Sequence, residues 1–193
     1  MAHFTVFGGN GFIGQEITQK LRAAGHKVTV PSRDQFSPTK HGFGHVIWCI
    51  GLTADFRTRP HDTLEAHCTL ASKVISQNSH KSFLYLSSTR VYSNSTDGKE
   101  DSHTQICLDN YDDLYNSTKL TGELITLVSA GPNAKVVRLS NVVGPMEWKR
   151  QTFLGYLIRG ALSGKVSLDT DLSTEKDYIW IGDVSDMIFQ ISI

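Results

Sequence analysis

The sequence lacks an excess of charge of either sign. Its 19 lysine and arginine residues balance 19 aspartate and glutamate residues over 193 positions, and it contains no basic block or acidic tail. Proteins that bind nucleic acids through the phosphate backbone usually carry a basic patch or stripe. We therefore expect no nucleic-acid partner.

Cysteine is also scarce. Cys49, Cys68 and Cys107 are odd in number, widely spaced and without a C-x-x-C pair, which argues against a disulfide framework or a zinc site. Two of the eight histidines, His41 and His45, lie close together, but no third ligand is evident near them. We therefore expect no metal site. This cysteine usage fits the reducing cytoplasm.

Long apolar runs are missing as well. The first residues lack the basic-then-apolar order of a signal peptide, and no apolar run reaches the ~18 residues that span a membrane. We expect a cytoplasmic protein without a membrane segment. The chain has no internal repeat, low-complexity tract or Pro/Gly-rich linker, so we predict one domain over residues 1–193.

The chain does contain a regular alternation of strand and helix patterns. Short apolar runs predict strands at residues 4–7, 26–30, 45–50, 81–88 and 134–140. Helical spacing predicts helices at residues 12–24, 61–77, 114–130, 151–164 and 183–193. In the third of these helices, Leu120, Leu124, Leu127 and Val128 share one face. The alternation predicts a doubly wound, Rossmann-like α/β fold with a parallel sheet and helices on both faces.

The stretch GGNGFIG lies between the first predicted strand and the first predicted helix. The first N–H groups of a helix lack intrahelical partners and, with the helix dipole, attract phosphate. Glycines there permit a tight turn and a close approach to the phosphate. We therefore predict a dinucleotide pyrophosphate site at Gly8, Gly11, Phe12, Ile13 and Gly14. The alternative is a glycine-rich turn that binds nothing.

The end of the second predicted strand bears on the choice between NAD and NADP. An acidic residue there typically binds the ribose 2′-hydroxyl of NAD, and an arginine accommodates the 2′-phosphate of NADP. Here Ser32 and Arg33 come first and Asp34 follows. Arg33 mildly favours NADP and Asp34 keeps NAD open, whereas Arg33 as a solvated loop charge would favour neither.

A second group of polar residues lies about a hundred residues later. Tyr115 and Lys119 are four positions apart on a predicted helix, so they share one face. Ser87, Ser88 and Thr89 end the fourth predicted strand. Since ligands bind beyond the carboxyl ends of strands in an open parallel sheet, we expect the serines and the glycine stretch to share one crevice. Taken alone, the tyrosine–lysine pair would more simply be a surface pair.

Five motifs together resemble those of a known family: GGNGFIG, SSTRVYS, YNSTK, RLSNVVGP and DYIWIGDV. In order and approximate spacing, over essentially the whole chain, they resemble the extended short-chain dehydrogenase/reductases. The resemblance is to their NAD(P)-dependent epimerase/dehydratase branch, which acts on nucleotide sugars. It implies that Tyr115, Lys119 and Ser88 are catalytic and that Lys119 also holds the nicotinamide ribose. It further implies that Thr89 and Asn141 lie near the substrate, although a strand-end asparagine often only serves a turn.

The resemblance implies proton and hydride transfer between a sugar hydroxyl and a nicotinamide. A free tyrosine has a pKa of about 10, so we expect Lys119 and the nicotinamide to lower the pKa of Tyr115. Tyr115 would then take the sugar proton, and Ser88 would hydrogen-bond the same sugar oxygen. Epimerases, dehydratases and reductases share this step, so the resemblance does not choose among them.

The chain also departs from the family pattern. Family members are usually much longer, and we expect the C-terminal lobe that grips the nucleotide sugar to be largely missing here. A non-catalytic dinucleotide-binding module and a fragment of a longer enzyme therefore stay open as alternatives. His67 stands where the family commonly has asparagine, near the cofactor. By resemblance alone, a homodimer through the helix of Tyr115 is expected.

Overall fold

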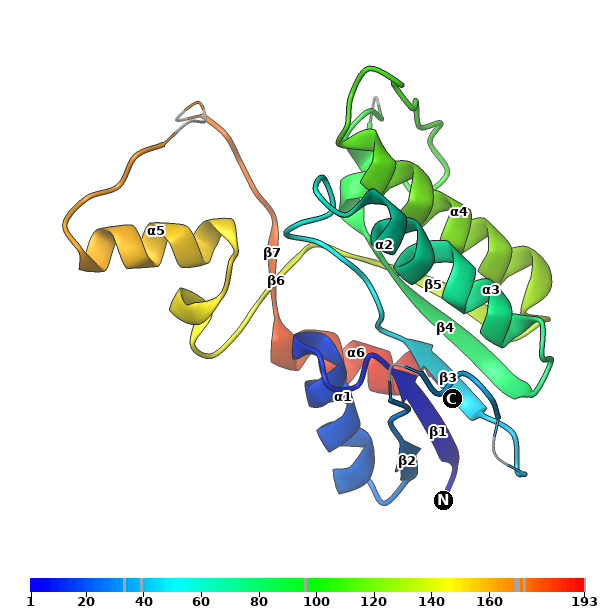
Figure 1. Ribbon diagram of the computed structural model, residues 1–193. Coiled ribbons are helices and arrows are strands. Elements are labelled where there is room, and N and C mark those ends of the chain that lie inside the picture. The colour runs from blue at the N-terminus through cyan, green and yellow to red at the C-terminus, as the bar shows by residue number, and fades with distance from the viewer. Residues whose placement is uncertain (33, 39, 96, 169–170, 172, 193) are drawn as a thin grey trace.

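A wholly parallel sheet forms the centre of the computed structural model, which describes residues 1–32, 34–38, 40–95, 97–168, 171 and 173–192 (Figure 1). Its five strands pair in the order β2-β1-β3-β4-β5. They are β1 (His3–Phe7), β2 (Lys27–Thr29), β3 (Gly44–Trp48), β4 (His80–Ser88) and β5 (Ala134–Leu139). The order reverses between β1 and β3, which confirms the predicted doubly wound, Rossmann-like fold.

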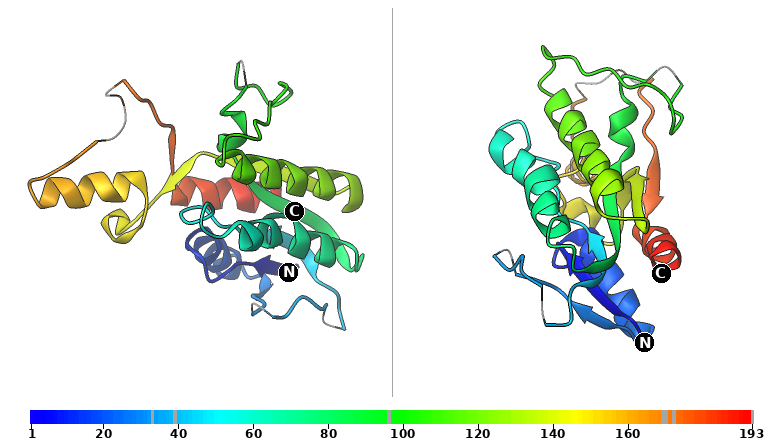
Figure 2. Two further views of the ribbon diagram at one scale, coloured as in Figure 1. Left: turned by 45° about the horizontal axis from the view of Figure 1, so that its top comes forward. Right: turned by 90° about the vertical axis from the view of Figure 1, so that its right-hand side faces the viewer.

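Helices cover both faces of this sheet (Figure 2). On one face, α1 (Phe12–Ala23) and α6 (Ile181–Ile191) bury Leu21 and Ile188 against Leu84 of β4. On the other face, α3 (Leu70–Ile75) and α4 (Asp113–Ser129) close a second core around Trp48 and Phe83. These strands are apolar on both faces, as expected for a sheet that is buried on both sides.

The helical segment predicted at residues 61–77 contains a π-helical turn. It consists of α2 (Pro60–Leu64), the π turn η1 (Glu65–Thr69) and α3. Pro60 begins it at a first-turn position, where its missing N–H costs no hydrogen bond. Such π turns within α-helices are frequently found at functional sites. This one carries His67, which is completely buried.

A short second sheet joins segments that the sequence patterns did not predict as strands. Strand β6 (Asn141–Val143) pairs in parallel with β7 (Tyr178–Trp180). Neither strand was predicted because a run of three residues is too short to show an alternating pattern. Between them lie η3 (Glu147–Lys149) and α5 (Phe153–Leu162), which extends away from the main sheet (Figure 1). No helix among the described residues is long and apolar enough to cross a membrane.

Helix α4 buries a small and polar face rather than its leucines. Thr118, Gly122 and Thr126 lie against the sheet layer, whereas Leu124 is 63% exposed and Val128 81% exposed. A Cβ built on Gly122 would lie 2.4 Å from the Tyr85 hydroxyl and 2.5 Å from the His67 carbonyl oxygen. The helix therefore approaches β4 and η1 as closely as its backbone allows.

We expect Gly122→Ala to destabilise the protein, although alanine has the higher helix propensity. The added methyl group has no room, so the free energy of unfolding should fall by about 1–3 kcal/mol. Urea denaturation measures this change. Thr121→Ala, at the neighbouring exposed position, should change the free energy by less than about 0.5 kcal/mol. Equal midpoints for Gly122→Ala and the unmodified protein would show that the close contact is no constraint.

Candidate active site

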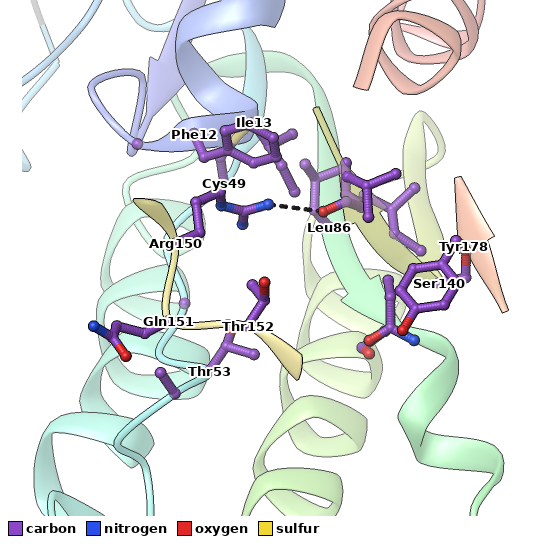
Figure 3. Close-up of a pocket in the computed structure, with 18 of the residues that line it drawn as sticks. Phe12, Ile13, Cys49, Thr53, Leu86, Ser140, Arg150, Gln151, Thr152 and Tyr178 are labelled. Atoms are coloured by element: carbon purple, nitrogen blue, oxygen red, sulfur yellow. Dashed lines mark hydrogen bonds between the residues drawn. The ribbon is translucent and has the colours of Figure 1, made fainter. Parts of the chain in front are cut away.

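A cleft with a volume of about 540 Å³ opens beyond the carboxyl ends of the strands (Figure 3). It lies at the point where the strand order reverses, where ligands bind in doubly wound sheets. Segments far apart in the sequence form its walls. They include Gly11–Gly14, Cys49–Gly51, Thr53, Ser87, Ser88, Tyr115, Lys119, Asn141, Glu147, Arg150, Thr152 and Tyr178. The structure thus brings the glycine stretch, the serines and the tyrosine–lysine pair together, as predicted.

The glycine stretch forms a tight turn into α1. Gly8 has a φ of +77°, and a Cβ on Gly14 would lie 2.3 Å from the Gly8 carbonyl oxygen. Gly11 is the N-cap of α1 and provides no side-chain cap, and the first turn carries no acidic residue. The backbone N–H groups that begin α1 therefore lie at the cleft with a favourable dipole, which fits the phosphate of a dinucleotide.

Tyr115 is a buried residue, 4% exposed. The Ser88 and Thr53 hydroxyl groups act on its phenol by lowering its pKa. The Ser88 oxygen also accepts the backbone N–H of Arg90 at 3.2 Å, so its own proton is free for the phenol oxygen. Burial raises the pKa of Tyr115, and the two hydroxyls and Arg90 offset part of this increase. The net direction is opposite to the expected lowering, because burial outweighs the nearby donors and charge.

Lys119 is a buried cation one turn further along α4. Its Nζ donates to the Leu86 carbonyl oxygen at 3.0 Å and lies 5.1 Å from the centre of the Tyr85 ring. Burial lowers the pKa of Lys119 to about 8, and Glu123 opposes this effect. An ammonium group has three donors, so further donors are available to a ligand in the cleft. A deprotonated Lys119 is therefore accessible at mildly alkaline pH.

His67 connects α4 to the loop that carries Thr53. Its Nε2 accepts the Leu52 N–H at 3.2 Å, so Nδ1 carries the proton and donates to the Thr118 hydroxyl at 2.8 Å. Burial lowers the pKa of His67 to about 3, and the Lys119 charge adds to the effect. The neutral ring packs edge-on against Tyr115 at 5.1 Å. His67 thus fixes both the loop and the tyrosine.

Other predicted site residues lie elsewhere. Ser32 is exposed after β2 and is not among the cleft residues, and Arg33 lies outside the described residues. The Thr89 hydroxyl donates to a backbone carbonyl of β5, and the structure does not bring Thr89 to the cleft. Asn141 lines the cleft, but its amide donates to the Asp177 carbonyl oxygen at 2.9 Å and so ties β6 to β7.

The structure adds cleft residues that the sequence patterns did not indicate. Thr53 comes from the loop after β3, and no motif marks it. Arg150 stacks on the Phe12 ring, with its guanidinium carbon 3.6 Å from the ring centre (Figure 3). It also donates to the Glu147 carboxylate at 2.9 Å. The Ser87 hydroxyl is buried at the cleft without a partner among the described residues, as expected for a group that a ligand satisfies. Within the described ranges, no group of three or more His, Cys, Asp or Glu could hold a metal ion.

Comparisons with known proteins identify the family of the chain and solved structures with a similar fold. The model of the NAD dependent epimerase/dehydratase family matches residues 4–192. No curated protein sequence matches the chain. The structure of MoeE5 in complex with UDP-glucose and NAD is similar, with a TM-score of 0.79 and 22% identity over 98% of this chain and 71% of that one.

Two further solved structures have the same fold. The NAD dependent NDP-hexosamine 5,6-dehydratase TunA, involved in tunicamycin biosynthesis, has a TM-score of 0.79 and 19% identity over 98% of this chain and 72% of that one. UDP-glucuronic acid 4-epimerase from Bacillus cereus, solved as a mutant, has a TM-score of 0.78 and 16% identity, over 95% of this chain and 70% of that one. All three are longer than this chain.

We expect His67 to make the protein less stable in acid. Its pKa is about 3 when folded and 6.5 in the unfolded reference, so the unfolded chain takes up the proton first. The stabilisation is complete above pH 6.5 and is lost as the pH falls toward 3. Between pH 6.5 and about pH 4.5, the free energy of unfolding should fall by about 2 kcal/mol more than in His67→Asn. Urea denaturation across this pH range tests this; parallel pH profiles would contradict it.

Proposed function

The chain belongs to the NAD dependent epimerase/dehydratase family, and from that premise we propose that it is a nicotinamide-dinucleotide-dependent enzyme acting on a nucleotide sugar. One observation carries the proposal. Tyr115, Ser88 and Thr53 line the same cleft as the N-terminus of α1. A proton-transferring group and a phosphate-binding helix end thus lie in one site.

The cofactor would be held by groups already in place. The backbone N–H groups at the start of α1 would bind the pyrophosphate, and Lys119 and Ser87 would bind closer to the nicotinamide end. When bound, the cofactor supplies hydride chemistry. Structures similar to this chain were solved with NAD, and that of human epimerase family protein SDR39U1 with NADPH. Both cofactors occur among these structures, so the comparisons support a nicotinamide dinucleotide but not the lean toward NADP that Arg33 suggested.

Residues of the protein would accept the proton that the substrate releases. Tyr115 in its ionised form would take it from a sugar hydroxyl, and the Ser88 and Thr53 hydroxyls would donate to the sugar oxygen that loses the proton. Lys119 stays charged below its pKa of about 8 and would bind ligand oxygens with its remaining donors. His67 would keep the loop of Thr53 in position through Leu52.

The substrate would lie against the wall formed by the C-terminal segments. Asn141, Thr152 and Tyr178 offer groups suited to sugar hydroxyls, and Arg150 offers a cation suited to a phosphate. MoeE5 was solved with UDP-glucose and with UDP-glucuronic acid. These two compounds are therefore the first substrates to test.

A non-catalytic dinucleotide-binding module is the second candidate. The chain covers 71% of MoeE5. This candidate predicts that the protein binds NAD or NADP but converts no nucleotide sugar. The two functions differ in turnover and agree in cofactor binding.

We expect Tyr115→Phe to lower turnover of UDP-glucose or UDP-glucuronic acid by at least about 100-fold, because loss of a general base typically costs this much. Calorimetric titration with NAD and NADP should give dissociation constants close to those of the unmodified protein. Tyr111→Phe, in an exposed position four residues earlier, is the matched control and should retain activity.

Equal turnover in Tyr115→Phe would rule out the assigned role of Tyr115. Cofactor binding without turnover in the unmodified protein would favour the non-catalytic module. Binding of neither NAD nor NADP would exclude both candidates for this chain.

A homodimer through the outer face of α4 is the oligomeric state that we propose. Leu124, Leu127 and Val128 are 63%, 54% and 81% exposed on that face, and such an apolar stripe usually marks an interaction surface.

We expect the double substitution Leu124→Lys with Leu127→Lys to give a monomer, because two charges would be desolvated at the interface. Size-exclusion chromatography with light scattering measures the mass. Leu162→Lys, at a 77% exposed position on α5, should leave the dimer intact. A monomeric unmodified protein would refute the interface.

A further inference from the structure

A stack of rings and cations lies against the Tyr115 ring. The Phe56 ring is completely buried and lies 5.4 Å from the Tyr115 ring. Two guanidinium groups lie on Phe56, that of Arg57 at 4.6 Å and that of Arg90 at 4.9 Å. Arg90 also lies 5.2 Å from the centre of the Tyr115 ring. This arrangement brings the loop after β3, the turn η2 (Thr89–Tyr92) and α4 together.

Asp112, the residue before α4, holds both guanidinium groups. Arg57 donates to its carboxylate through Nη2 at 2.7 Å, and Arg90 does so through Nη2 at 2.8 Å. The two arginines, Arg57 most strongly, hold the pKa of the Asp112 carboxyl below its usual range. The cluster therefore contains two cations and one anion, which leaves one net positive charge beside the tyrosine.

The titratable groups around Tyr115 differ in charge and in whether they contact its ring. His67 from η1 is neutral, and Tyr85 from β4 is a buried phenol whose pKa burial raises. The ammonium of Lys119 points to the Leu86 carbonyl oxygen. Asp112 and Arg57 lie beyond Arg90 and Phe56. Arg90 is thus the cation that contacts the Tyr115 ring, and its backbone N–H also orients the Ser88 hydroxyl.

We propose that Arg90 is an electrostatic positioning residue for Tyr115: its guanidinium stabilises the negative charge of the ionised phenol, and Asp112 fixes the guanidinium in place. The inference rests on the proposed function, in which Tyr115 accepts the substrate proton. Arg90 touches neither cofactor nor substrate in this scheme and acts only through Tyr115. An arginine keeps its charge at any pH at which the enzyme could work.

The chain offers a matched pair of variants for the test. Arg90→Gln and Arg57→Gln each remove a guanidinium group that binds Asp112 and lies on Phe56, but only Arg90 lies on Tyr115. A fluorinated tyrosine that ionises near neutral pH, incorporated at position 115, allows its pKa to be measured by ¹⁹F NMR. We expect Arg90→Gln to raise this pKa by about 0.5–1, as a partly solvated charge about 5 Å away would. Arg57→Gln should change it much less, and Arg90→Lys should largely restore it.

Asp112→Asn provides a test of opposite sign. The amide oxygen introduced at position 112 can still accept the Arg90 N–H and so hold the guanidinium, but the anion is gone. More net positive charge is then left beside the phenol, so the pKa at position 115 should fall. This variant keeps the proposal testable if Arg90→Gln does not fold. In active enzyme with the natural tyrosine, the acid limb of the kcat profile should move to higher pH in Arg90→Gln and stay in place in Arg57→Gln.

If the pKa at position 115 shifts equally in Arg90→Gln and Arg57→Gln, or shifts in neither, the cluster has only a structural role and the proposal is wrong. A raised pKa in Asp112→Asn would do the same. The NMR measurement needs no turnover, so it stands apart from the proposed function. If Tyr115→Phe retains full activity, the function fails, whereas the effect of Arg90 on the phenol is judged by the titration alone.

Discussion

The close approach of α4 to the sheet at Gly122 is the constraint on which the site depends. At this point the helix backbone lies against the Tyr85 hydroxyl, which donates to the His67 carbonyl oxygen at 2.9 Å. A helix rises 1.5 Å per residue, so Lys119 and Tyr115 lie about one and two turns nearer the carboxyl end of β4. Any larger residue at 122 would move the helix outward and both functional groups with it. The small, polar buried face of α4 follows from this requirement.

Close packing of polar groups shifts the ionisation of each. Burial lowers the pKa of His67 to about 3 and that of Lys119 to about 8, and it raises the pKa of Tyr115. The fold tolerates these groups because each has partners: the Leu52 N–H and Thr118 for His67, and the Leu86 carbonyl for Lys119. Strongly perturbed groups that share one cleft are typical of catalytic sites. The Arg90 charge offsets part of the effect of burial on the pKa of Tyr115.

The cleft is shared between two parts of the chain with different roles. The N-terminal part contributes the turn at Gly8–Gly14 and the ends of β3 and β4, all tied to the central sheet. The C-terminal part contributes β6 and β7, which form a separate two-stranded sheet (Figure 1), and the turn η3. Under the proposed function, dinucleotide binding would depend chiefly on the first part, and selection among nucleotide sugars on the second. This division explains why one fold supports several related reactions.

The sequence by itself determined the strand–helix alternation, the tight turn at Gly8 and the pairing of Tyr115 with Lys119. Each depends on neighbours within a few residues: apolar periodicity, glycine spacing and the four-residue step of a helix. Only the tertiary structure decided that Thr53, His67 and Arg90 surround the tyrosine, because they come from three separate elements that the strand order and Gly122 bring together. It also decided that Leu124 and Val128 face outward. Helical spacing shows that such residues share a face, but not which face the sheet covers.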